Sequence, residues 1–252
     1  MKNTQAKLGI LDWGIGGVSI VKFLDESGRN FPILYFSDTG ALPYGRMPRR
    51  ELISRLNAVI EFLKTKGATH IVIGCNAAST AIEFLSEREL KIEGVIESAV
   101  IQTAKLKPKN LAVIGGKRTV LSGIYRRKFA EKDIKIKQRI AQPLSGFIES
   151  GDVNSAKLRE EASKILNPIK NSSHILLACT HYPAISEVLK DFVLPDTKFV
   201  NPANALVQKI EKWNLSGAGK DVFYTTGDAE NMKRAAQNAF GFSFRKAEKV
   251  EI

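Results

Sequence analysis

Two short apolar runs, each ending in a cysteine, constrain this chain more than any other feature. Residues 70–74 lead into Cys75, and residues 174–178 lead into Cys179. Both runs have the length and the Val/Ile/Leu content of buried parallel strands. In open α/β sheets, ligands bind beyond the carboxyl ends of such strands. Because these are the only two cysteines in 252 residues, the pattern predicts two thiols that face one site.

The spacing of the two runs indicates an internal duplication. Cys179 follows Cys75 by 104 positions (179 − 75). Two further pairs of segments align at nearly the same offset: 8–14 with 111–116, and 94–99 with 198–203. Three pairs in one order are typical of two copies of one α/β unit. Chance similarity between Val/Ile-rich strands is the alternative explanation.

Predicted strands and helices alternate along the chain. The elements predicted in the first half are strand 7–12, helix 18–26, strand 31–37, helix 48–66, strand 70–74 and helix 77–86. This alternation is typical of a doubly wound parallel sheet, and residues 111–200 repeat it. The tail predicts one more strand and turn at 222–228 and a helix at 230–240, which need a sheet to join.

These patterns predict an α/β fold of two similar doubly wound domains. Their parallel sheets are expected to be related by a pseudo-two-fold axis, with the active site in the cleft between them. We expect the tail to return to the first domain. The predicted boundaries are therefore 1–97 plus 207–252 for the first domain and 98–206 for the second.

Length and cysteine usage narrow the class of protein. A chain of 252 residues with 44% hydrophobic content is long enough to bury one large core or two ordinary ones. No apolar run approaches 18 residues and the N-terminus lacks a signal-peptide core, so no membrane association is expected. Two cysteines in different halves form no disulfide framework, which favours a reducing cytoplasm. No motif with metal-ligand spacing occurs, and no metal site is expected.

The net charge of +12, from 38 basic and 26 acidic residues, has two interpretations. Clusters of basic residues at 46–50, 105–109 and 126–139 would attract an anionic substrate or a nucleic acid. They would also suit ordinary solvated helix faces. Because no helix-turn-helix, zinc-finger or RNA-binding signature accompanies them, nucleic-acid binding is not the expected role.

The glycine-rich turn at 14–17 does not predict a nucleotide site. It departs from the Gly-x-Gly-x-x-Gly pattern because position 19 is serine, and it is no Walker loop. It predicts instead a tight strand-to-helix turn whose backbone N–H groups can receive a carboxylate.

Six short motifs occur together in a fixed order. They are Asp12-x-Gly14-x-Gly-Gly17, Asp38-Thr-x-x-x-Pro43-Tyr44-Gly45, Cys75-Asn76-x-Ala-Ser79, Gly94-Val-Ile-Glu97, Cys179-Thr180-His181-Tyr-Pro183 and Thr225-Thr-Gly-Asp228. With these motifs the chain resembles the cofactor-independent glutamate racemases of the aspartate/glutamate racemase superfamily. The resemblance extends from Leu8 to about Phe240.

Two thiols suit racemisation, which removes the Cα proton from one face of an amino acid and returns a proton to the other. The resemblance implies that Cys75 is the base for the D-enantiomer and Cys179 for the L-enantiomer. It also implies that Asp12 is the partner near Cys75, His181 the partner near Cys179, and Glu149 a further acid of the catalytic site. No cofactor is expected. Because a free cysteine is mostly protonated at neutral pH, we expect the site to lower the pKa of its thiols.

The resemblance also carries over substrate-binding positions. They are Trp13, Pro43, Tyr44, Gly45, Asn76, Ala77, Thr119 and Thr180. Each assignment has a structural alternative. A cysteine can be buried and inert, Asp12 can cap a helix, His181 can bond a carbonyl, and Glu149 can be a surface acid.

The chain departs from the family pattern at several positions. Trp13 and Ala77 stand where the family usually has serine and threonine, so two hydroxyls that help to seat the substrate are missing. Gly116 and Arg118 alter the loop that usually reads Gly-Thr-x-Gly-Thr. A lost hydrogen bond to a charged group costs roughly 1.5–3 kcal/mol. These changes leave the thiols intact and make the substrate the open question.

The sequence therefore predicts a cytoplasmic, cofactor-independent racemase for glutamate that supplies D-glutamate for peptidoglycan, and so for cell wall and cell shape. A homodimer is left open. Two alternatives remain: a racemase or epimerase for another small amino acid, and a weakly active racemase-like binding protein. Retention of both cysteines with Asp12 and His181 favours catalysis.

Overall fold

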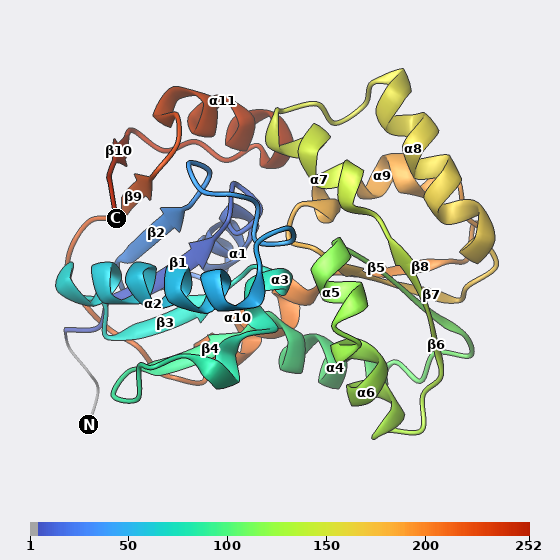
Figure 1. The fold of residues 1–252 in the computed structure, drawn as a ribbon, viewed down its shortest axis with the longest axis horizontal. Helices are drawn as coiled ribbons and strands as arrows, with labels where there is room; N and C mark the ends of the chain where they lie inside the picture. The colour runs from blue at the N-terminus through green and yellow to red at the C-terminus, as the bar shows by residue number, and fades with distance from the viewer. Residues whose placement is uncertain (1–4) are drawn as a thin grey trace.

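Two parallel β-sheets organise the molecule, which is represented by a computed structural model that describes residues 5–252 (Figure 1). The first sheet has six strands in the order β10-β9-β2-β1-β3-β4. Its strands are β1 (Leu8–Asp12), β2 (Ile33–Ser37), β3 (His70–Ile73), β4 (Lys91–Gly94), β9 (Val222–Thr225) and β10 (Ala247–Lys249). β1 and β2 are buried along their whole length, as expected for central parallel strands covered on both faces.

The second sheet repeats the middle of the first. It has four strands in the order β6-β5-β7-β8. They are β5 (Leu111–Gly115), β6 (Ile136–Ile140), β7 (His174–Ala178) and β8 (Lys198–Val200). In the first sheet Leu8 of β1 pairs with Ile33 and His70. In the second sheet Leu111 of β5 pairs with Ile136 and His174 in the same pattern.

The matching strand order and register confirm the predicted pair of similar doubly wound domains. The likeness extends to a detail at the start of β3 and β7. The hydroxyl of Thr69 lies 2.9 Å from Nδ1 of His70, and the hydroxyl of Ser173 lies 3.1 Å from Nδ1 of His174. Such agreement in contacts, beyond composition, favours duplication over chance similarity of strands.

Helices cover both faces of each sheet (Figure 1). The helices of the first half are α1 (Val18–Glu26), α2 (Arg49–Thr65), α3 (Asn76–Ser79), the 3-10 helix η1 (Ile82–Phe84) and α4 (Val95–Lys105). Those that follow are α5 (Lys117–Leu121), α6 (Ile124–Ala130), α7 (Gln142–Glu149), α8 (Ala156–Leu166), η2 (Asn167–Ile169), η3 (Tyr182–Ile185), α9 (Ser186–Lys190), α10 (Pro202–Glu211) and α11 (Ala229–Phe240). α2 buries one side at helical spacing, through Leu52, Leu56, Val59, Ile60 and Leu63.

The largest hydrophobic core is continuous between the two sheets. It joins Ile10 and Val72 of the first sheet to Val113 and Leu176 of the second, together with buried residues of α4 and α10. Two smaller cores lie on the outer faces of the sheets, under α2 and under α7–α9. Because the shared core holds the sheets side by side, the carboxyl ends of β3 and β7 meet at one place.

The tail returns to the first sheet as expected. β9 pairs with β2 and β10 with β9, all in parallel. The exact limits of the two domains stay a prediction. The proposed limits at residues 97 and 206 fall inside α4 and α10, which connect the two sheets.

One predicted helix is wrong. Residues 77–86 form only the end of α3 and the 3-10 helix η1. The hydroxyl of Ser79 donates to the carbonyl of Ile73 and accepts from the N–H of Val95, and the hydroxyl of Thr80 donates to the carbonyl of Ala77. Such side-chain bonds to the backbone compete with the bonds of a continuing helix. No helix among residues 5–252 is long and apolar enough to cross a membrane.

Candidate active site

Cys75 and Cys179 line one small cavity between the two sheets. Each follows the carboxyl end of its strand, β3 or β7. The cavity has a volume of about 40 Å³. The predicted site residues on its walls are Asp12, Trp13, Pro43, Tyr44, Gly45, Cys75, Asn76, Ala77, Thr119, Cys179, Thr180 and His181. Among the predicted residues only Glu149 is not part of the wall. It reaches the site indirectly, through a hydrogen bond to His181.

On the side of Cys179, the thiol, an imidazole and a carboxylate form a chain. Sγ of Cys179 lies 3.6 Å from Nδ1 of His181, and Nε2 of His181 lies 2.6 Å from Oε2 of Glu149. Burial disfavours the imidazolium, but the hydrogen bonds to Cys179 and Glu149 outweigh burial and raise the pKa of His181 well above its usual value. A proton on this ring stabilises negative charge on the neighbouring sulfur.

The side of Cys75 is electrostatically different. Burial, and then the nearby carboxylate of Asp12, raise the pKa of the Cys75 thiol well above its usual value. The backbone N–H groups of Ala77 and Ala78 oppose this only in part. The expected lowering of the pKa is therefore wrong for Cys75 in this closed site, because burial outweighs the donors. Cys75 is therefore a neutral thiol in this site.

Asp12 is a buried carboxylate held by the other domain. The hydroxyl of Thr180 donates to Oδ2 of Asp12 at 2.8 Å, and the N–H of Trp13 donates to Oδ1 at 2.7 Å. Burial raises the pKa of Asp12, with the charge of His181 acting in the opposite direction. The carboxylate therefore lies within reach of both halves of the site.

Asn76 carries an unused donor group. The hydroxyl of Tyr125 donates to Oδ1 of Asn76 at 2.6 Å. Nδ2 of Asn76 is buried and has no hydrogen-bond partner within residues 5–252. Buried donors in native proteins are nearly always satisfied. An unsatisfied amide on the wall of a cavity is suited to a carboxylate ligand.

The glycine-rich turn after β1 receives a carboxylate, as predicted. The N–H of Ile15 donates to Oε2 of Glu149 at 2.9 Å. A Cβ on Gly14 would lie 2.0 Å from that carboxylate oxygen, and a Cβ on Gly16 would lie 2.3 Å from the hydroxyl oxygen of Thr180. Glycine is required at these positions because Glu149 and Thr180 of the second domain press against the turn.

Comparison with known proteins decides the family. Residues 17–210 match the family described as Asp/Glu/Hydantoin racemase. The chain belongs to this racemase family. The glutamate racemase of Lactobacillus johnsonii is 32% identical to it, over 88% of this chain and 89% of the relative. The glutamate racemase of Fusobacterium nucleatum is 31% identical over 96% of each chain.

The fold of this racemase agrees with a solved relative. The crystal structure of the glutamate racemase of Francisella tularensis in complex with D-glutamate matches it with a TM-score of 0.88 and 25% identity. The match covers 98% of each chain. The racemase is thus an enzyme of an amino-acid racemase family with the two-domain glutamate racemase fold.

The rim of the racemase site is closed by a loop of the first domain. Trp13 donates its indole N–H to the carbonyl of Ala41 at 3.1 Å. The phenol of Tyr44 donates to the buried carboxylate of Asp38 at 2.8 Å, so the phenol is bound within the first domain. Across the cleft, Arg118 of α5 donates to the carbonyls of Tyr44 and Met47.

Sequence reasoning missed several wall residues. They are Gln142, Ser145 and Ala178; Gly116, which also lines the wall, is named from the sequence only as a departure from the family loop. Oε1 of Gln142 accepts from the N–H of Lys117, and Nε2 donates to the hydroxyl of Ser145. The first of these contacts joins α5 to α7, and the second lies within α7. Nothing in the local sequence marks them, because they depend on how two helices of the second domain pack.

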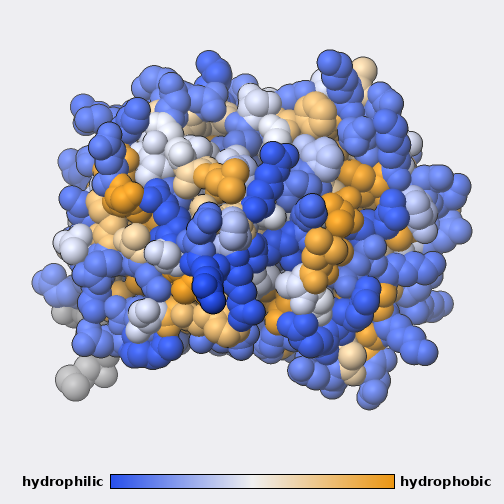
Figure 2. Space-filling view, viewed as in Figure 1, coloured by the Kyte–Doolittle hydropathy of each residue, from blue (hydrophilic) through white to orange (hydrophobic). Residues whose placement is uncertain are grey.

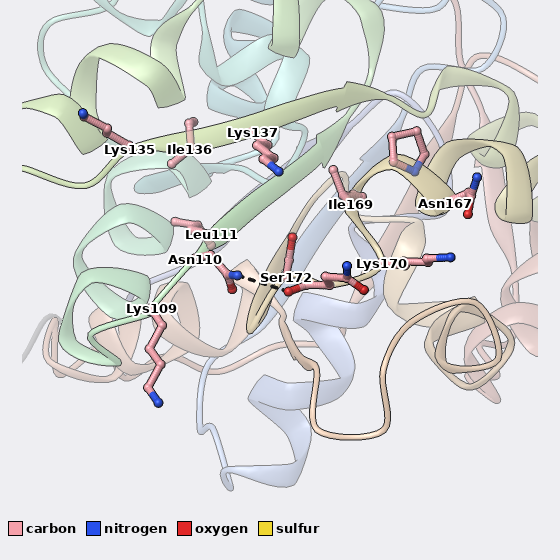
Figure 3. A pocket seen from close by; sticks show the side chains of 12 residues that line it. Lys109, Asn110, Leu111, Lys135, Ile136, Lys137, Asn167, Ile169, Lys170 and Ser172 are labelled. Carbon is pink, nitrogen blue, oxygen red and sulfur yellow. Dashed lines mark hydrogen bonds between the residues drawn. The ribbon is translucent and has the colours of Figure 1, made fainter.

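A larger cavity, of about 320 Å³, lies at the other edge of the second sheet. It is next to the first residues of β5 and β6 and is lined by Lys109, Lys135, Lys137 and Lys170. Figure 3 shows the amino groups of Lys109, Lys135 and Lys170 pointing in different directions, so they do not converge on one ligand. No cysteine, histidine or acidic residue within residues 5–252 lines it, and it offers no acid/base pair for the chemistry of this family.

Proposed function

We propose that this racemase interconverts L- and D-glutamate without a cofactor, by proton transfer at Cα between Cys179 and Cys75. One observation carries the proposal: the two cysteines of the chain line the same cavity, one from each domain. The two relatives at 31–32% identity, both glutamate racemases, support glutamate as the substrate.

The two thiols begin the reaction in different states. From L-glutamate, the sulfur of Cys179 takes the Cα proton as a thiolate, and the thiol of Cys75 gives its proton to the opposite face. Cys179 then carries a proton and Cys75 is the thiolate, which reverses the roles for D-glutamate. His181, whose Nε2 lies 2.6 Å from Oε2 of Glu149, stabilises negative charge on the sulfur of Cys179. Asp12 is the corresponding partner residue near Cys75.

Substrate binding uses polar groups around the cavity. The free amide donor of Asn76 suits one carboxylate of glutamate. The buried hydroxyl-bearing residues Thr119 and Thr180 and the backbone at Tyr44 and Gly45 also line the cavity. A site closed around the substrate excludes water and strengthens these charged hydrogen bonds. By this proposal the racemase supplies D-glutamate for peptidoglycan in the cytoplasm, where its free thiols stay reduced.

A second candidate is racemisation of another small amino acid. Ala77 and Gly116 offer no hydroxyl, and Trp13 brings an indole to the wall. A cavity of about 40 Å³ accommodates only about three water molecules, so either glutamate enters after the rim opens or a smaller substrate is preferred.

Exchange of the Cα proton tests both candidates directly. The enzyme is incubated in deuterated water with a panel of L- and D-amino acids, and loss of the Cα proton signal is followed by NMR together with optical rotation. We expect exchange and racemisation with glutamate above all others. Exchange with another amino acid alone would establish the second candidate, and no exchange with any would overturn the assignment.

The cysteine variants test the assignment of the bases. Cys75→Ser and Cys179→Ser should each reduce racemisation by about 10²- to 10⁴-fold, the usual contribution of a positioned acid or base. Circular dichroism and thermal melting show whether each variant is folded. A folded variant that racemises at the parental rate would show that its cysteine is not a base.

A further inference from the structure

The active-site cavity has no positive counter-charge for a dicarboxylate. Within residues 5–252, no lysine or arginine lines it. Its charged groups are the carboxylate of Asp12 and the ring of His181, whose charge is already balanced by Glu149. A substrate with two carboxylates would bring one net negative charge into a buried, acidic site, and such a charge requires a partner.

Arg118 is a cation close to the wall of this cavity. It lies in α5, between the cavity-lining residues Gly116 and Thr119. Its guanidinium is half-buried and donates to the carbonyl of Tyr44 at 3.0 Å and to the carbonyl of Met47. Among residues 5–252 no carboxylate lies within ion-pairing distance of it. Its charge is therefore satisfied only by neutral oxygens.

The surroundings of Arg118 keep its charge poorly compensated. Burial, and then the neighbouring charge of Arg49, lower the pKa of Arg118, while the sulfur of Cys75 acts in the opposite direction. The guanidinium of Arg118 thus interacts electrostatically with the sulfur of Cys75 in the cavity wall. Figure 2 shows strongly hydrophilic surface in the middle of the face that it draws, near the place where Figure 1 shows the start of α2. Arg46, Arg49 and Arg50, at or just before the start of α2, are exposed, and so is Lys117 of α5.

Opening of the rim at Tyr44 and Met47 would release the bonds that Arg118 makes there. The cavity of about 40 Å³ is too small for any dicarboxylic amino acid, which is several times the size of a water molecule. Arg118 ties α5 of the second domain to the rim segment at Tyr44 and Met47. When this segment moves aside, the guanidinium loses two neutral acceptors at the mouth of the site and can take a charged one.

We propose that Arg118 is a specificity-determining residue that binds the side-chain carboxylate of the substrate through its planar fork of N–H donors. The inference rests on the proposed racemase function and names its substrate class as dicarboxylic amino acids. Arg118 would take the place of the hydroxyls that are absent at Ala77 and Gly116. Hydrogen bonds between guanidinium and carboxylate are about twice as strong as neutral ones, which makes one arginine an adequate substitute.

Substituting Arg118 tests the proposal against a matched control. Arg118→Gln removes the charge and keeps hydrogen-bonding capacity, and Arg118→Lys keeps the charge and removes the fork. Arg46→Gln removes the same charge from an exposed residue of the same rim segment. The measured quantities are kcat/KM for glutamate and for glutamine, its uncharged analogue, in each variant.

We expect Arg118→Gln to lower kcat/KM for glutamate by about 10- to 100-fold, mainly through KM, and to leave that for glutamine within about threefold. For Arg118→Lys we expect a kcat/KM for glutamate between those of the parent and Arg118→Gln. For Arg46→Gln we expect a kcat/KM for glutamate close to that of the parent. An equal loss for both substrates would show a structural role at the rim. An unchanged kcat/KM for glutamate would show that the carboxylate is bound elsewhere. Either result overturns the proposal.

Binding measurements separate this proposal from the proposed function. Isothermal titration of D-glutamate and D-glutamine into the parent and Arg118→Gln reports charge recognition without turnover. If the parent binds D-glutamate in an Arg118-dependent way but racemises no amino acid, the proposed function fails and the role of Arg118 stands. If the parent binds D-glutamate no better than D-glutamine, the role of Arg118 is wrong.

Discussion

Glu149 and His181 are joined by a 2.6 Å hydrogen bond, and the same carboxylate oxygen of Glu149 accepts the N–H of Ile15 from the other domain. One carboxylate therefore performs two tasks. It supports the charge of the imidazole beside Cys179, and it fastens the glycine-rich turn against the second domain. The residue that supports the charge of His181 thus also links the second domain to the turn after β1.

Replacing Glu149 should lower the pKa of His181. In Glu149→Gln the ring of His181 loses a charged acceptor. Burial, which favours the neutral imidazole, then lowers its pKa. Only three histidines exist in the chain. In the parent, His181 should titrate at higher pH than His70 and His174, whose pKa values are lowered by burial and by neighbouring lysines.

NMR titration of the three imidazoles provides the measurement, with His70 and His174 as internal controls. In Glu149→Gln the His181 midpoint should move down while the other two stay. Turnover of L-glutamate should fall by about 10- to 100-fold, the equivalent of one charged hydrogen bond. A His181 midpoint that does not move would show that Glu149 does not support its charge.

The two cysteines should differ in reactivity toward an alkylating agent. The thiolate is the reactive species. Cys75 has a raised pKa from burial and from Asp12, whereas Cys179 lies beside the imidazole of His181. With iodoacetamide at neutral pH we expect Cys179 to react at least about tenfold faster than Cys75, as measured by peptide mass spectrometry over time.

The histidine variants supply the control for this reactivity. His181→Asn should slow alkylation of Cys179, and His174→Asn, which alters a ring at the opposite end of β7, should not. Equal rates for the two cysteines in the parent, or a faster reaction at Cys75, would contradict the assigned asymmetry of the site.

Most of the fold could be predicted because its signals are local. The apolar runs before Cys75 and Cys179 mark buried strands, and their repeated spacing marks the duplication. The helix predicted at 77–86 failed because the hydroxyls of Ser79 and Thr80 bond to backbone groups. That competition depends on where the neighbouring strand and helix lie, and a single sequence does not record it.

The site could be predicted only as far as short motifs reach. The cysteine loops, Asp12 and His181 lie in such motifs, and the structure brings them around one cavity. The contact of Arg118 with Tyr44 and Met47 joins residues more than 70 positions apart. No pattern in either segment predicts this contact. Its only trace in the sequence is a departure from the family pattern.

The close approach of the glycine-rich turn to the second domain predicts a severe effect of a single methyl group. In Gly16→Ala the new Cβ would lie 2.3 Å from the hydroxyl oxygen of Thr180 and 2.7 Å from Nδ1 of His181. The cleft cannot close around both, so kcat/KM for glutamate should fall by at least about tenfold. The melting temperature should fall as well.

Gly146→Ala is the matched control. Gly146 is exposed in α7, and a Cβ there would meet no atom within 4 Å. An alanine in a helix interior should stabilise the fold by roughly 0.5–1 kcal/mol and leave turnover unchanged. If Gly16→Ala behaved like Gly146→Ala in steady-state kinetics, the turn would not need to meet Thr180 and His181 during catalysis.

The buried carboxylate of Asp12 should make the enzyme less stable at neutral pH than an isosteric variant. Burial raises its pKa above the unfolded value of 3.8, so the folded state binds a proton more tightly than the unfolded state. The stability that this group contributes is present below pH 3.8 and is lost as pH rises through the raised pKa. At pH 8 the folded state holds a charge that the unfolded state would expose to water.

Asp12→Asn removes that titration and can keep both hydrogen bonds, with its carbonyl accepting from Trp13 and its amide donating to Thr180. Urea unfolding at pH 4 and pH 8 is the measurement, and Asp196→Asn, at an exposed position, corrects for the change in net charge. Relative to that control, Asp12→Asn should gain stability at pH 8 and little at pH 4, while racemisation falls by about 10²- to 10⁴-fold. A loss of stability at pH 8 would mean that the carboxylate's bonds to Thr180 and Trp13 outweigh its burial. Gain of stability with loss of turnover would instead show that this charge is retained for catalysis at the expense of the fold.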